Sequence, residues 1–212
     1  MTMPIRFIYF DLGNVLVQFD PQQGCERLAG WLGVAAQDVR RVVWESGLQD
    51  EFEHGRISPP DFATRILIAL DCNDVDLQPS GQPLLDFLSD MFTPLNQTLE
   101  LVGDLQRQQI RFGILSNTCC AHWDWILRQP WDLPCRESVA NILSFEVGAM
   151  KPQGRIYQVA QAAANVPPES IFFTDDRSEN VAAATALGWQ THCFSDAFGL
   201  RNALRDRGVL QA

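Results

Sequence analysis

The sequence has no apolar run long enough to span a membrane, and its 16 lysines and arginines are outnumbered by 26 acidic residues. A membrane-spanning helix needs about 20 predominantly apolar residues. The first ten residues also lack the basic start, long apolar stretch and small-residue cleavage site of a signal peptide. The formal charge of −10 opposes broad binding to nucleic acid or to an anionic membrane surface. A local cationic site for a small anion is still compatible with it.

Paired-cysteine metal motifs are absent too. The six cysteines form no Cys-x-x-Cys pair, and none lies at zinc-finger spacing with a histidine. We therefore expect free thiols and a cytoplasmic protein. For the adjacent pair Cys119-Cys120, ordinary packing is favoured over a redox role. The cysteines are Cys25, Cys72, Cys119, Cys120, Cys135 and Cys193.

The chain alternates short strand-like and longer helix-like segments. Apolar or β-branched runs predict strands at 5–10, 110–115, 142–145, 171–174 and 190–194. Helical spacing of apolar residues predicts helices at 95–108, 156–164 and 178–187. This alternation predicts an α/β fold with a three-layer, Rossmann-like core in which helices cover both faces of a parallel sheet.

The segment 18–91 interrupts that alternation. It predicts four helices with no strand between them, the first starting at Asp20-Pro21, a good cap followed by a good first-turn proline. We therefore expect a core formed by 1–17 and 92–212, with 18–91 inserted as an all-helical cap. An insertion directly after the first strand would cover the carboxyl end of that strand.

Polar side chains follow four of the predicted strands. In open α/β sheets, ligands bind beyond the carboxyl ends of the strands, so these groups are expected to meet at one edge. The set offers carboxylates for Mg²⁺, a cation for a phosphate and a carboxylate for nucleophilic attack that would form an aspartyl-phosphate. Its members are Asp11, Ser116, Asn117, Lys151, Asp175 and Asp176.

Four segments carry a family resemblance. They are 10–16 (FDLGNVL), 114–117 (ILSN), 150–152 (MKP) and 172–176 (FFTDD), and they lie in the same order along almost the whole chain. In this order and spacing they resemble the four motifs of the haloacid dehalogenase-like hydrolase superfamily, most of whose members are phosphatases. The helical insertion is similar to the small cap that closes over the site in that family.

The resemblance implies catalytic and substrate-binding roles. Asp11 matches the nucleophile, and Ser116, with Asn117 beside it, matches the phosphate-binding hydroxyl. Lys151 matches the lysine that acts both in catalysis and on the phosphate.

The same resemblance implies a magnesium site. Its ligands would be the carboxylate of Asp11, the backbone carbonyl of Gly13 and Asp176, with Asp175 close by and acting through water. A backbone ligand is retained whatever the side chain at position 13.

Position 13 departs from the usual pattern, because most family phosphatases carry an aspartate there that transfers protons in both steps. Such help is typically worth about 10²–10⁴-fold in rate. A slow phosphatase, an acid–base group supplied from elsewhere, and a function other than phosphate hydrolysis all remain open explanations. We hypothesise a contribution from His54 or Asp20 in the cap; alternatively, His54 is a solvated residue at a helix end.

The run Asp-Leu-Gly-Asn-Val and the segment 53–58 (EHGRIS) also resemble a bacterial branch that includes phosphatases acting on sugar phosphates such as glucose 1-phosphate. We therefore predict a Mg²⁺-dependent phosphatase whose partner is a small phosphorylated metabolite, acting as a monomer or weak dimer. A 2-haloacid dehalogenase and a weakly active or non-catalytic binding module on the same fold are the alternatives.

Overall fold

The computed structural model describes residues 3–131, 133 and 138–210. Its centre is a parallel sheet of five strands in the order β5-β4-β1-β6-β7. The strands are β1 (Phe7–Phe10), β4 (Phe112–Ser116), β5 (Ala140–Leu143), β6 (Ile171–Asp175) and β7 (Gln190–Cys193). The predicted α/β fold with a Rossmann-like sheet is thus confirmed.

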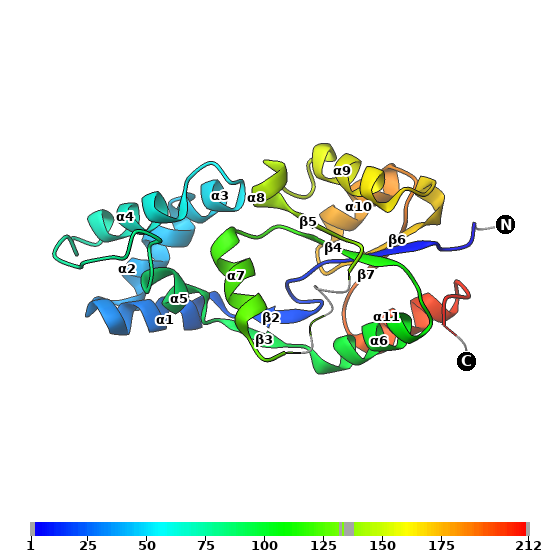
Figure 1. The fold of residues 1–212 in the computed structure, drawn as a ribbon, viewed down its shortest axis with the longest axis horizontal. Coiled ribbons are helices and arrows are strands. Elements are labelled where there is room, and N and C mark those ends of the chain that lie inside the picture. The colour runs from blue at the N-terminus through cyan, green and yellow to red at the C-terminus, as the bar shows by residue number, and fades with distance from the viewer. Residues whose placement is uncertain (1–2, 132, 134–137, 211–212) are drawn as a thin grey trace.

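Helices cover both faces of the sheet (Figure 1). Ile8 and Phe10 of β1 pack into one apolar cluster with α6 (Asn96–Arg107) and α11 (Ala197–Arg205). Phe7 and Tyr9 pack into another with α9 (Gly154–Ala164) and α10 (Ser178–Ala186). Every residue of β1 is buried because successive side chains enter opposite layers, and this explains its unbroken apolar sequence.

The inserted helices form the separate lobe at the left of Figure 1. They are α1 (Pro21–Leu32), α2 (Ala36–Arg40) continued by a π-helical turn (Arg41–Glu45), α3 (Leu48–Glu53), α4 (Pro59–Ala69) and α5 (Leu84–Ser89). We call α1 to α5 and their connections the cap. The cap buries an apolar cluster of its own, which includes Leu28, Phe62 and Leu84.

A short antiparallel ribbon joins the cap to the core. It consists of β2 (Val17–Phe19) and β3 (Phe92–Pro94), with Gln18 opposite Thr93. The boundary expected after residue 17 falls inside β2. The expected number of four cap helices is wrong, because the segment expected to form the second helix is followed by α3 after Gly47, which has a left-handed backbone.

Other local expectations need correction. The segment 142–145 is not one strand, because β5 ends at Leu143 and Ser144 begins the short helix α8 (Ser144–Val147). The helices α7 (Cys120–Arg128) and α11 were not predicted either, and the 3-10 turn Pro168–Ser170 precedes β6. The described cysteines are free thiols, and Cys135 lies outside the described residues. No helix in the described ranges is long and apolar enough to cross a bilayer.

Candidate active site

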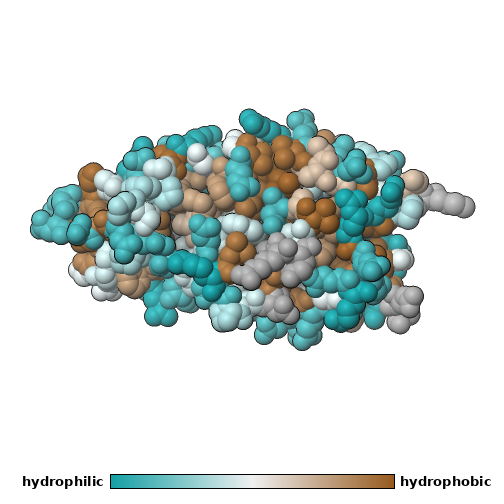
Figure 2. Space-filling model, in the orientation of Figure 1, coloured by the Kyte–Doolittle hydropathy of each residue, from teal (hydrophilic) through white to brown (hydrophobic). Residues whose placement is uncertain are grey.

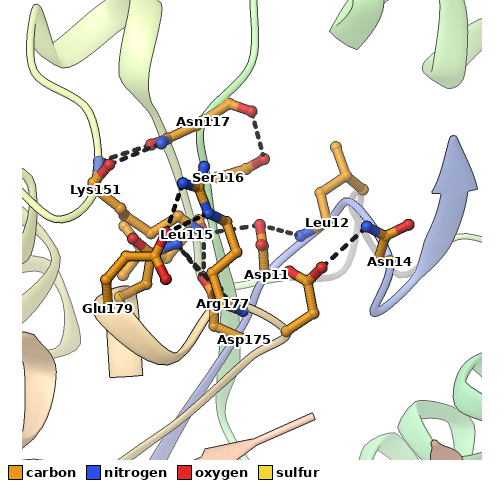
Figure 3. A network of polar contacts seen from close by, with 12 residues as sticks. Asp11, Leu12, Asn14, Leu115, Ser116, Asn117, Lys151, Asp175, Arg177 and Glu179 are labelled. Atoms are coloured by element: carbon orange, nitrogen blue, oxygen red, sulfur yellow. Dashed lines mark hydrogen bonds and ion pairs between the residues drawn. The ribbon is translucent and has the colours of Figure 1, made fainter. Parts of the chain in front are cut away.

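Asp11 directly follows β1, the middle strand of the sheet, and its side chain is almost completely buried. Its Oδ1 accepts a hydrogen bond from the backbone N–H of Leu12 at 2.7 Å (Figure 3). The same oxygen forms an ion pair with Lys151 Nζ at 2.8 Å. Burial raises the pKa of Asp11 to about 7; Lys151 opposes this rise and the neighbouring Asp175 adds to it. A positive charge beside Asp11 is therefore needed to keep it ionised.

Lys151 connects three elements of the core. Besides Asp11, its Nζ contacts Asp175 Oδ2 at 2.6 Å and the carbonyl of Leu115 at 2.8 Å. Its backbone is paired with the side chain of Asn117: Lys151 N–H donates to Asn117 Oδ1 at 2.7 Å, and Asn117 Nδ2 donates to the Lys151 carbonyl at 2.9 Å. Asn117 therefore fixes the loop that carries the lysine.

Asp175 and Asp176 have different surroundings although they are adjacent. Asp175 is fully buried and accepts hydrogen bonds from Asn180 Nδ2 and from the backbone N–H of Arg177, in addition to the lysine. Asp176 is partly exposed, and its Oδ2 accepts from Asn14 Nδ2 at 2.9 Å. Asp176 thus keeps more oxygen capacity for an external ligand than Asp175.

These carboxylates can hold a divalent cation. One oxygen from each of Asp11, Asp175 and Asp176 lies within 4.8 Å of the others. Ionisation of all three carboxylates beside one lysine would leave a negative excess of two charges in a largely buried place, which a divalent ion would balance. An all-oxygen donor set suits Mg²⁺. The donor chemistry therefore fits the expected ion.

A cavity of about 260 Å³ opens onto this cluster. Core residues line its floor, and cap or ribbon residues line its other walls. Ser116, the last residue of β4, is almost completely buried in the floor. The remaining lining residues include Gly13, Asn14, Phe19, Trp44, Glu53, Phe92, Asn117, His122, Arg177 and Asn180. The sequence-predicted groups Asp11, Ser116, Asn117, Lys151 and Asp176 all reach this one cavity.

The two cap candidates lie elsewhere. Asp20 caps α1, with its side chain accepting from the N–H of Gln22, and it is not among the lining residues of the cavity. His54 directly follows α3 as its C-terminal cap residue and does not line the cavity either. The expectation that His54 is solvated is wrong: its ring is buried, with Nδ1 2.8 Å from the carbonyl of Asp50 and Nε2 3.4 Å from Gln153.

Glu53, the neighbour of His54, is a titratable cavity residue of the cap to which the sequence analysis gave no role. A signal was available, because Gln49, Phe52 and Glu53 are spaced to share one face of a helix. Gln49 and Phe52 are buried, and Glu53 is turned toward the same interior. A charged residue such as Glu53 on the buried face of a cap helix indicates a side chain that faces the site. His122 also lines the cavity.

Comparison with solved structures finds similar proteins of the HAD family. A predicted HAD-like hydrolase from Porphyromonas gingivalis matches with a TM-score of 0.77 and 26% identity, covering 99% of this chain and 100% of that one. A HAD family enzyme from Bacteroides thetaiotaomicron, solved with magnesium and inorganic phosphate, matches with a TM-score of 0.76 and 23% identity over 91% of this chain and 95% of that one. These similarities support a haloacid dehalogenase-like (HAD) hydrolase.

A curated relative agrees with that HAD assignment. D-ribitol-5-phosphate phosphatase of Bacteroides thetaiotaomicron is 26% identical over 193 residues, which cover 88% of this chain and 90% of that protein. No protein-family model matches the chain.

Proposed function

We propose that this HAD hydrolase is a Mg²⁺-dependent phosphatase of small phosphate monoesters of the sugar or sugar-alcohol type. The observation that carries the proposal is the arrangement of Asp11 and Asp175 on either side of Lys151, next to Asp176. Asp11, Lys151 and Asp176 line a small cavity, and Asp175 is buried behind them. Phosphoryl transfer depends mainly on positioning and charge neutralisation, and this site offers both.

Asp11 is the proposed nucleophile. A carboxylate oxygen attacks phosphorus, the bond from phosphorus to the leaving oxygen breaks, and an aspartyl-phosphate forms that water then hydrolyses. Lys151 opposes the rise in the pKa of Asp11, which favours the ionised form, and it receives the phosphate charge. Ser116 and Asn117 bind the phosphate oxygens. Asn117 also keeps the lysine loop in register with β4.

The proposed Mg²⁺ ligands are the carboxylate of Asp11, the backbone carbonyl of Gly13 and Asp176, with Asp175 acting through water. Bound there, the ion supplies positive charge that balances the carboxylates and the phosphate. Asn14 orients Asp176, and Asn180 and Lys151 orient Asp175.

Two observations support a small metabolite as substrate. The cavity is near the small end of ligand sites, which span about 300–1,000 Å³. The curated relative is named for its action on D-ribitol 5-phosphate. A sugar or sugar-alcohol phosphate of about five or six carbons would suit both. We place this activity in the cytoplasm, in a protein that is a monomer or weak dimer; both remain predictions.

The test is hydrolysis of 4-nitrophenyl phosphate with Mg²⁺, followed by a panel of sugar, sugar-alcohol, nucleotide and amino-acid phosphates. We expect turnover that stops on chelation and is lost in Asp11→Asn, which keeps the size of the side chain but not its nucleophilic charge. Activity that persists in this variant or in chelator would overturn the proposal. Halide release from a 2-haloacid would favour the dehalogenase, which needs no metal.

A further inference from the structure

Position 13 leaves the proposed phosphatase without the usual proton-transfer side chain, and the structure shows what fills that space. A Cβ added to Gly13 would lie 3.2 and 3.3 Å from two carbons of the Phe19 ring. Phe19 comes from β2 in the ribbon and lines the cavity. The site is therefore built around a glycine at position 13, and a proton donor must reach the substrate from another direction.

Few described residues of the cavity can supply that proton. Asp11 and Lys151 are paired with each other, and Asp176 belongs to the proposed metal site. The Arg177 guanidinium is ion-paired with Glu179. Among the described lining residues, the titratable groups that remain are His122 and Glu53.

His122 is unsuited to proton donation. Its ring is buried, with its centroid 5.3 Å from that of Phe92 in an edge-on arrangement. Burial lowers its pKa to about 4, so the ring is neutral at pH 7, and the N–H that a neutral imidazole keeps is too weakly acidic to protonate a leaving oxygen.

Glu53 has the required chemistry. It is the last residue of α3, and it lines the cavity from the cap. Its Oε1 accepts a hydrogen bond from Gln49 Nε2 at 2.9 Å. Burial raises its pKa, and Asp50 adds to the rise, whereas Gln49, His54 and Arg177 oppose it. Burial raises the pKa of the Cys119 thiol, and the nearby charge of Glu53 adds to that rise.

The backbone of Glu53 is attached to the core. Ser144 Oγ lies 2.7 Å from the carbonyl of Glu53 and 2.9 Å from that of Thr118, and it accepts a hydrogen bond from the N–H of Thr118 at 2.9 Å. Thr118 follows Ser116 and Asn117 in the same loop. One serine therefore sets the position of the cap glutamate relative to the proposed phosphate-binding residues.

The direction of approach completes the argument. In phosphoryl transfer the attacking and leaving oxygens lie roughly in line with phosphorus. With Asp11 attacking from the sheet edge, the leaving oxygen points away from the sheet, toward the cap. Glu53 is the one titratable cap residue among the described lining residues.

We propose that the carboxyl group of Glu53 is the acid–base catalyst of this site and performs the role that Gly13 cannot; the inference rests on the proposed phosphatase function. In the first step an oxygen of Asp11 bonds to phosphorus, and the bond from phosphorus to the leaving oxygen breaks. The leaving oxygen keeps the electron pair and takes the proton of Glu53, so the alcohol departs and Glu53 becomes a carboxylate.

In the second step that carboxylate takes a proton from a water molecule in the position vacated by the alcohol. The water oxygen bonds to phosphorus, and the bond from phosphorus to Asp11 breaks with its electrons returning to the aspartate. Inorganic phosphate leaves, Asp11 is again a carboxylate, and Glu53 is again protonated.

The experiment compares Glu53→Gln with Glu51→Gln, its matched control on the same helix. Glu51 is a surface residue paired with Arg65 and does not line the cavity. Both variants and the parent are assayed with Mg²⁺ on a series of aryl phosphates of rising leaving-group pKa. Thermal unfolding checks folding, and Glu53→Asp tests whether a shorter carboxyl group restores part of the rate.

For Glu53→Gln we expect kcat to fall by about 10²-fold or more, with the larger losses on poorer leaving groups. A burst of 4-nitrophenol should precede slow turnover, and intact-mass measurement should detect phosphate on the protein. The Glu51→Gln variant should behave like the parent.

An unchanged leaving-group dependence without phosphoenzyme accumulation would overturn the role of Glu53, as would a change in KM alone, which would mark a binding contact. If the parent protein itself hydrolyses none of the esters, the phosphatase proposal fails as well. An active parent with an unaffected Glu53→Gln variant overturns only the present inference.

Discussion

At the residue scale, Gly13 and Phe19 form a matched pair. The backbone of Gly13 bridges to Val17, and the Phe19 ring lies where a side chain at position 13 would start. The glycine is therefore more than a lost catalytic group. It lets the aromatic ring of the ribbon approach the loop that follows the proposed nucleophile, and this ring forms part of the cavity wall.

This pairing predicts non-additive stability. Gly13→Asp alone should lower the free energy of unfolding by about 1–3 kcal/mol, because the new side chain must displace a packed ring. In a Phe19→Leu background, the loss in free energy of unfolding caused by Gly13→Asp should be smaller by about 0.5–1 kcal/mol. Urea unfolding of the four proteins measures this coupling, and simple additivity would show that Phe19 does not restrict position 13.

At the element scale, the cap touches the core where α3 meets α8. Figure 1 shows these two helices side by side between the lobes. Ser144 of α8 holds the carbonyl of Glu53, and Gln153 lies beside the His54 ring. Next along the chain, a Cβ on Gly55 would lie 2.2 Å from the Phe145 carbonyl oxygen. Contact this close requires glycine, so residues 53–55 act as the latch between cap and core.

The latch can be tested with two alanine substitutions. Gly55 and Gly33 both have left-handed backbones, with φ of 68° and 72°, but a Cβ on Gly33 would meet nothing within 4 Å. Gly33→Ala should therefore cost only the backbone strain, about 1–2 kcal/mol. Gly55→Ala should cost more, or push the cap from the core and lower kcat.

Denaturant unfolding and aryl phosphate turnover of both variants provide the measurement. Equal losses of stability with unchanged turnover in both would show that the approach of Gly55 to Phe145 does not hold the cap in place.

At the scale of the whole molecule, the protein carries a large excess of negative charge. Hydrophilic side chains cover much of the face in Figure 2, with smaller hydrophobic areas among them, and the formal charge is −10. The proposed site adds buried carboxylates, offset inside the core by Lys151. The protein has no excess of basic surface residues that would compensate the negative charge of these carboxylates. The site therefore needs a bound cation more than the same site in a neutral protein would.

This need predicts a pH-dependent affinity for Mg²⁺. The pKa of Asp11 is about 7 in the folded protein and 3.8 in its ordinary state. The metal-free fold therefore holds a proton that the unfolded chain has released, so this group's contribution to stability is lost as pH rises from about 4 to about 7. Mg²⁺ binding must expel that proton, so affinity should rise roughly tenfold per pH unit up to about pH 7 and then level off.

Calorimetric titration with Mg²⁺ at several pH values measures this dependence. Saturation at about 100 times Kd should also stabilise the fold by about 2.7 kcal/mol. The Asp11→Asn variant should bind more weakly and lose the slope below pH 7. A flat affinity in the parent protein over that range would contradict the proposed ligand role of Asp11.

Much of the core could be predicted from sequence for definite reasons. The strand β1 and the first three residues of β6 are apolar because helices cover both faces of the sheet, and the polar residues that follow must share one edge of a parallel sheet. The short helices α3 and α8 escaped prediction, because four to six residues carry too little periodic pattern. Asp20 was visible as a helix cap, and it caps α1.

The sequence by itself determined the parallel sheet, the inserted helices and the polar groups at the sheet edge, because backbone periodicity and chain order encode these features. Only the tertiary structure decided which cap side chain reaches the cavity. His54 and Glu53 are adjacent in sequence, but helix geometry turns them in different directions, and contacts with Ser144 and Gln153 fix both. The same division holds at position 13. The sequence shows that a side chain is missing there, but it does not show that the Phe19 ring lies beside Gly13. That placement depends on the pairing of β2 with β3, in which Gln18 lies opposite Thr93, 75 residues further along the chain.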